Sequence, residues 1–123
     1  FVFSSEVLFP TASDEVSPEG MIQLTRLAET LKTLSAEIPA DLPWVLQVDG
    51  HTDRRPISTP RFPSNWELST ARALAIVKIL RGQGIPPQRL AATGYGEFHP
   101  LDARTSDEAY ARNRRIELKL TSR

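Results

Sequence analysis

The chain has 123 residues, of which 40% are hydrophobic, and it contains no cysteine. This composition predicts one folded domain over residues 1–123 and excludes disulfides, thiol catalysis and cysteine-ligated metal. Fifteen basic residues balance fifteen acidic ones, so there is no general electrostatic reason to bind nucleic acid or an anionic membrane.

The first half of the chain predicts a strand, a helix and a second strand. Residues 1–3 alternate weakly and predict a short strand, and the apolar patch at 7–10 predicts a turn packed on the core. Ser17-Pro18 is a typical helix start, and apolar residues then recur at three- and four-residue steps, which predicts an amphipathic helix over 18–36. Residues 44–49 would place apolar side chains on both faces of a strand, as expected of a central strand.

The second half adds a helix, a strand, a short helix and a last strand. A capping-box spacing starts the helix over 64–81, and a strand follows at 90–95. Residues 107–112 predict a short helix. Residues 115–120 alternate strictly, which predicts a strand with one face in the core and one in solvent. The core face would carry Ile116, Leu118 and Leu120, and the solvent face Arg115, Glu117 and Lys119.

This element order, β-α-β-α-β-(α)-β, predicts an α/β (α+β) two-layer sandwich. Its mixed four-stranded sheet would be covered by helices. Because residue 1 is phenylalanine, we expect the chain to be part of a longer protein, with any membrane segment upstream.

Asp53 is the first candidate site residue, because it lies where the strand over 44–49 gives way to a charged loop at 54–63. Arg72 is the second, because it shares the core face of its helix with Leu68 and Ile76. A guanidinium on that face needs a partner or open water. The simplest geometry places Asp53 and Arg72 at the opening of the same crevice.

Two hypotheses fit such a pair. It could be an internal salt bridge, or it could receive a zwitterion whose ammonium binds Asp53 and whose carboxylate binds Arg72. Arg114, at the start of the last strand, and Asn65, near the start of the second long helix, leave the same choice open between a structural and a ligand-binding role.

His51 raises an enzymatic alternative. It could form a metal or acid–base cluster with Asp53, Glu97 and His99, but the spacing matches no strong metal motif. We therefore expect a buried His51 bonded to backbone, and we predict no catalytic residue, no metal site and no cofactor.

Four separated motifs in this order resemble the OmpA-like peptidoglycan-binding domain. They are Gly50-His51-Thr52-Asp53; Asn65-Trp66-Glu67-Leu68-Ser69 running into Ala71-Arg72-Ala73; Gly94-Tyr95-Gly96 with Pro100; and Asn113-Arg114-Arg115-Ile116-Glu117. The resemblance covers essentially the whole chain. It implies a non-catalytic module that holds peptidoglycan noncovalently through the diaminopimelate of the stem peptide. Asp53 and Arg72 match the family's ligand-binding aspartate and arginine, and Asn65, Leu68 and Arg114 match positions that line the pocket.

The loop at 54–63 resembles the MotB branch of this family, the stator proteins of the flagellar motor, and other relatives anchored in the inner membrane. This implies a periplasmic domain that anchors a larger membrane protein to the cell wall, that touches the membrane only through a segment upstream, and that dimerises. The alternatives are a small periplasmic hydrolase or metal enzyme using His51 and Asp53, and a protein-binding adaptor using the 54–63 loop.

Overall fold

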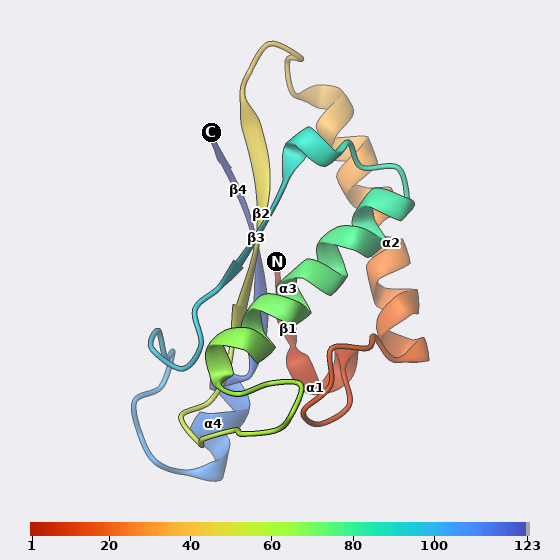
Figure 1. The fold of residues 1–123 in the computed structure, drawn as a ribbon. Coiled ribbons are helices and arrows are strands. Elements are labelled where there is room, and N and C mark those ends of the chain that lie inside the picture. The colour runs from red at the N-terminus through yellow and green to blue at the C-terminus, as the bar shows by residue number, and fades with distance from the viewer. Residues whose placement is uncertain (123) are drawn as a thin grey trace.

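The computed structural model describes residues 1–122. Its elements in chain order are β1 (Val2–Ser4), α1 (Ser5–Leu8), α2 (Pro18–Glu37), β2 (Trp44–His51), α3 (Asn65–Gly82), the 3₁₀ turn η1 (Pro87–Arg89), β3 (Leu90–Gly94), α4 (Asp107–Asn113) and β4 (Arg115–Ser122). The predicted order is confirmed, with one difference: the segment predicted as a turn includes the end of a short helix, α1. Figure 1 shows the elements in sequence colours.

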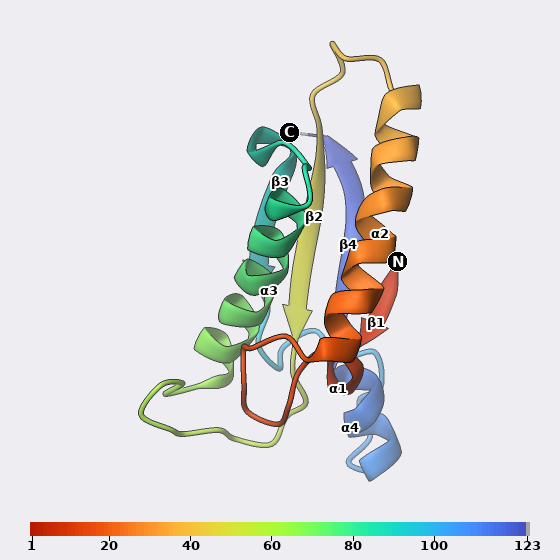
Figure 2. The ribbon, with the colours of Figure 1, turned by 90° about the vertical axis from the view of Figure 1, so that its right-hand side faces the viewer.

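The four strands form one mixed sheet in the order β1-β4-β2-β3. β2 pairs with β3 in parallel, whereas β4 runs antiparallel to both β1 and β2. Figure 1 shows the sheet nearly edge-on with α2 and α3 on the same side, and Figure 2 shows the two helices side by side in front of it. The predicted two-layer sandwich is therefore confirmed. No helix among residues 1–122 is both long and apolar enough to cross a membrane.

The core lies between these two helices and the sheet. The predicted helix starts are confirmed, because Ser17 and Ser64 each accept a hydrogen bond from a first-turn amide. Each helix then directs an apolar stripe at the sheet. The buried residues of this layer include Leu24, Ala28 and Leu31 of α2, Ala73, Ile76 and Leu80 of α3, and Leu46, Val48, Ile116 and Leu118 of the strands.

The prediction of a solvated face on β4 holds for Lys119, whose side chain is 56% exposed, but is wrong for Arg115 and Glu117. Arg115 is only 4% exposed, and the side chain of Glu117 is only 15% exposed. Arg115 reaches across to the loop that follows β3, where its Nη2 donates to the carbonyl of His99 at 3.0 Å. That loop has no apolar periodicity, so the sequence pattern could not show that it covers this face of the sheet. Leu120, predicted in the core, is 49% exposed near the end of the strand.

Candidate functional site

A cavity of about 580 Å³ opens beyond the carboxyl end of β2. Its walls come from α1 and the loop after it, the loop after β2, the first two turns of α3, and Arg114 between α4 and β4. The structure places all five predicted site residues on these walls: Asp53, Asn65, Leu68, Arg72 and Arg114.

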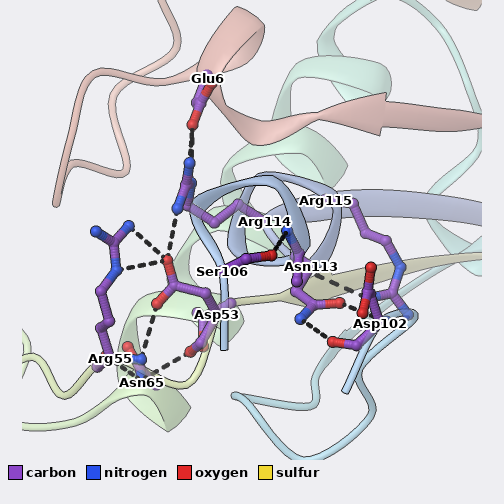
Figure 3. A network of polar contacts seen from close by, with 11 residues as sticks. Glu6, Asp53, Arg55, Asn65, Asp102, Ser106, Asn113, Arg114 and Arg115 are labelled. Carbon is purple, nitrogen blue, oxygen red and sulfur yellow. Dashed lines mark hydrogen bonds and ion pairs between the residues drawn. The ribbon is translucent and has the colours of Figure 1, made fainter. Parts of the chain in front are cut away.

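Asp53 lies in this cavity between two arginines (Figure 3), and only 6% of it is exposed. Its Oδ2 accepts from Arg55 Nη2 at 2.7 Å and from Arg114 Nη1 at 2.6 Å, while its Oδ1 accepts from the backbone amide of Arg55 at 2.9 Å. Burial by itself would raise the pKa of Asp53. The hydrogen bonds from both guanidinium groups outweigh this effect and hold the pKa below its usual value, so the carboxylate is ionised at neutral pH.

Arg72 does not pair with Asp53, so the internal salt bridge considered from the sequence is wrong. Instead its Nε donates to the carbonyl of Ser13 at 2.7 Å and its Nη2 to the carbonyl of Pro10 at 3.1 Å, while the guanidinium lies over the ring of Phe9. Burial lowers the pKa of Arg72 to about 10, which leaves the side chain charged at neutral pH. The loop after α1 reaches this face of α3 and supplies the acceptors. The two bonds use two of the five N–H groups of the guanidinium.

Arg114 joins three separate segments. Besides Asp53 it contacts Glu6 of α1, to which its Nε donates at 2.8 Å (Figure 3). Burial alone would lower the pKa of Arg114, but the hydrogen bonds to Asp53 and Glu6 raise it. Arg55 and Glu6 are cavity residues that sequence reasoning missed, because neither lies in an element with apolar periodicity.

Asn65 and Leu68 occupy the first turn of α3. The side-chain amide of Asn65 donates to the carbonyl of Arg55 at 3.1 Å and approaches the carbonyl of Asp53 and the carboxylate of Glu97, both at 3.4 Å. Asn65 therefore ties the loop after β2 to the helix. Leu68 is 5% exposed and forms an apolar wall of the cavity.

His51 belongs to a different environment. It is 5% exposed, and its ring stacks on Tyr95 with centroids 4.9 Å apart. Neither ring nitrogen has a hydrogen-bond partner within residues 1–122, so the prediction that backbone bonds hold His51 is wrong.

The hypothesised cluster of His51, Asp53, Glu97 and His99 is not assembled either. In the described part of the chain, the potential metal ligands that lie within 4.8 Å of one another are Asp49, His51 and Glu117. Both carboxylates of this group already have cationic partners. Glu117 accepts from Arg115 Nε at 2.5 Å, and Lys119 Nζ lies 3.5 Å from Asp49 and 3.3 Å from Glu117. This internal ion network opposes the entry of a further cation.

His51 should make folding stability depend on pH. Burial, and then the charge of Arg115, lower its pKa from 6.5 to about 4, against the opposing effects of Glu117 and Asp49. The unfolded chain therefore binds a proton between pH 6.5 and 4 that the folded chain does not, so stability should fall by up to about 3 kcal/mol as pH drops through this window. Urea unfolding at pH 7, 5.5 and 4 measures the loss. His51→Gln should flatten the dependence, and an unchanged slope in this variant would contradict the assignment.

Comparisons with known proteins give the family. The model of the OmpA family matches residues 8–114. Among curated proteins, the chain is 38% identical to the uncharacterised protein YtxE of Bacillus subtilis over 95% of its own length and 46% of that protein. The chain spans less than half the length of the curated relatives it matches first.

Solved structures agree with this assignment. A MotB-like protein from Desulfovibrio vulgaris superimposes with a TM-score of 0.87 at 35% identity, over 99% of this chain and 72% of that one. The cell wall anchor of the T6SS from Pseudomonas aeruginosa superimposes with a TM-score of 0.84 at 34% identity, over 99% of this chain and 80% of that one. The matched segment contains Asp53, Arg72 and most of the residues that line the cavity, and the chain therefore belongs to the OmpA family.

Proposed function

We propose that this chain binds peptidoglycan noncovalently through the diaminopimelate of the stem peptide. The observation that carries the proposal is a cavity in which a buried carboxylate, Asp53, and two guanidinium groups, Arg72 and Arg114, share the walls. The far end of diaminopimelate carries an ammonium and a carboxylate on one carbon atom. Asp53 would accept from the ammonium, and the unused N–H groups of Arg72 would donate to the carboxylate.

Arg55 indicates how a cation is received at Asp53. Its guanidinium donates two hydrogen bonds to Oδ2 of Asp53, and a ligand ammonium would have to bind at the same oxygen. The side chain of Arg55 is 56% exposed, whereas that of Arg114 is 23% exposed. Arg55 can therefore move into solvent at little cost in desolvation, while Arg114 stays and keeps Asp53 ionised.

The relatives support a role in anchoring. One structural neighbour is described as a cell wall anchor and another as MotB-like. We propose that this chain likewise tethers a larger protein to the cell wall, as a periplasmic module attached to the inner membrane through a segment outside residues 1–123. Its action as a single non-catalytic domain and its pairing into dimers are predictions from the same resemblance.

The competing hydrolase hypothesis has no support from the geometry. His51 stacks on Tyr95 beside Glu117, while Asp53 is bonded to arginines. A general base must lie within hydrogen-bond reach of the proton that it abstracts, and both ring nitrogens of His51 are buried. The adaptor hypothesis would require binding through the 54–63 loop that survives loss of Arg72.

Calorimetric titration with two stem tripeptides tests the proposal. We expect the tripeptide that ends in diaminopimelate to bind, and the same tripeptide with lysine at that position to bind about 30-fold more weakly or worse. Lysine keeps the ammonium but lacks the carboxylate, so it loses a charged contact of about 2–5 kcal/mol. Equal affinities would show that the arginine side of the cavity does not recognise a carboxylate.

A further inference from the structure

Two large aromatic side chains are exposed side by side near the cavity. Trp66, in the first turn of α3, is 49% exposed, and Phe98, in the loop after β3, is 58% exposed. Their rings stack with centroids 5.0 Å apart at an interplanar angle of 26°. A scattered apolar side chain on a surface needs no explanation, but a stacked aromatic pair that is half exposed to water is typical of a contact site. We call Trp66 and Phe98 the aromatic platform.

Hydrogen bonds fix the backbone of the loop on which the platform rests. Gly96 lies under both rings, and a side-chain carbon added to it would be 3.5 Å from each of them. The amide of Gly96 donates to Ser69 Oγ at 3.0 Å, and its carbonyl accepts from the amide of Thr52 at 2.9 Å. The loop is thus bonded both to α3 and to the segment after β2. A surface fixed in this way loses little entropy when it binds.

Asn65 connects the platform to the cavity. Trp66 follows Asn65, which lines the cavity, and Phe98 follows Glu97, whose carboxylate lies 3.4 Å from the side-chain amide of Asn65. Asn65 therefore links the cavity that contains Asp53 to the loop that carries Phe98.

We propose that the aromatic platform stacks against a sugar ring of the peptidoglycan glycan strand while the cavity holds the stem peptide. This inference rests on the proposed function, because the stem peptide is covalently attached to that strand. One face of a pyranose ring presents C–H groups, which complement the negative face of an aromatic ring. A protein partner fits less well, because two side chains are far smaller than the roughly 800 Å² that each partner buries in a stable protein interface.

Titration with two ligands tests the inference: the diaminopimelate tripeptide alone, and the same tripeptide carrying its disaccharide. We expect the disaccharide to strengthen binding to the unmodified chain about tenfold. The double variant Trp66→Ala, Phe98→Ala should lose this gain and keep its affinity for the free tripeptide. Phe98→Leu, which keeps apolar area without an aromatic face, should lose part of it. Ile22→Ala, at a 54% exposed position on α2, is the matched control and should change neither affinity.

Fluorescence gives an independent measurement. In a Trp44→Phe background, Trp66 is the remaining tryptophan of the chain, and its emission should shift to the blue with the disaccharide ligand and not with the free tripeptide. Circular dichroism checks that the variants remain folded.

Three results would overturn the inference: no gain from the disaccharide in the unmodified chain, a gain that survives in the double variant, or an equal loss for both ligands in that variant. Failure of the unmodified chain to bind the free tripeptide is a separate outcome. It would overturn the proposed function and this inference with it.

Discussion

Replacing Asp53 by asparagine should weaken binding of the diaminopimelate tripeptide by about 30-fold or more. The substitution keeps the shape of the side chain and removes its charge. Asp53 is 6% exposed, so a ligand ammonium would lose its counter-charge in a poorly hydrated position. Loss of one such buried charged contact is worth about 2–5 kcal/mol, or roughly 30- to 5,000-fold in affinity. Calorimetric titration and cosedimentation with purified peptidoglycan both measure it.

The matched control for Asp53→Asn is Asp102→Asn. Asp102 is also a largely covered carboxylate bonded by two arginines, since it accepts from Arg104 at 2.6 Å and from Arg112 at 3.1 Å, but it is not among the residues lining the cavity. We expect Asp102→Asn to leave the affinity within twofold, because this carboxylate does not line the cavity. Equal losses in the two variants would indicate that the charge acts through general stability or steering and not through contact with the ligand.

Replacing Arg55 should not weaken binding of the tripeptide as replacing Asp53 does. Its guanidinium competes for the same oxygen of Asp53, so Arg55→Gln should bind the tripeptide at least as tightly as the unmodified chain. Loss of binding in Arg55→Gln comparable to that in Asp53→Asn would contradict displacement of Arg55 by the ligand. Arg72→Ala is a less specific probe than either, because it also removes the donor from two loop carbonyls, those of Pro10 and Ser13.

Local patterns predicted most of the fold. The two long helices follow from apolar repeats and from the serines that cap them, and β2 follows from a run that is apolar on both parities. The position of Asp53 at the end of that strand, and of Arg72 on the core face of α3, follow from the same periodicities. These features depend on residues close in sequence, which is why a single sequence reveals them.

The pairing of charges could not be predicted in the same way. Only the packed chain decides that Arg55 and Arg114 contact Asp53 while Arg72 contacts the loop after α1. The environment of His51 depends similarly on Tyr95, far away in the sequence. Ion pairs and aromatic stacks are set by tertiary distances, and a sequence pattern records only which groups need partners.

Replacing Gly94 by alanine should destabilise the fold by about 3 kcal/mol or more. Gly94 of β3 pairs in register with Gly50 of β2, and α3 crosses the sheet directly above this pair. A side-chain carbon at position 94 would lie 2.5 Å from the backbone nitrogen of Thr70, and one at position 50 would lie 2.3 Å from the carbonyl oxygen of Ser69. Backbone atoms cannot rotate away, so either substitution must lift α3 from the sheet, at a cost at or above the upper end of ordinary overpacking.

Thermal and urea unfolding followed by circular dichroism measure this effect, and the melting temperature of Gly94→Ala should fall by about 10 °C or more. Gly82→Ala is the matched control, because Gly82 ends the same helix and has no atom within 4 Å of the added carbon. It should be neutral or slightly stabilising, since alanine favours helix over glycine by about 0.5–1 kcal/mol. Similar stabilities for the two variants would mean that α3 does not approach the sheet this closely.

The contact also matters for binding, because α3 carries Asn65, Leu68 and Arg72 on one rigid element. Any fraction of Gly94→Ala that remains folded should therefore bind the tripeptide more weakly than Gly82→Ala does.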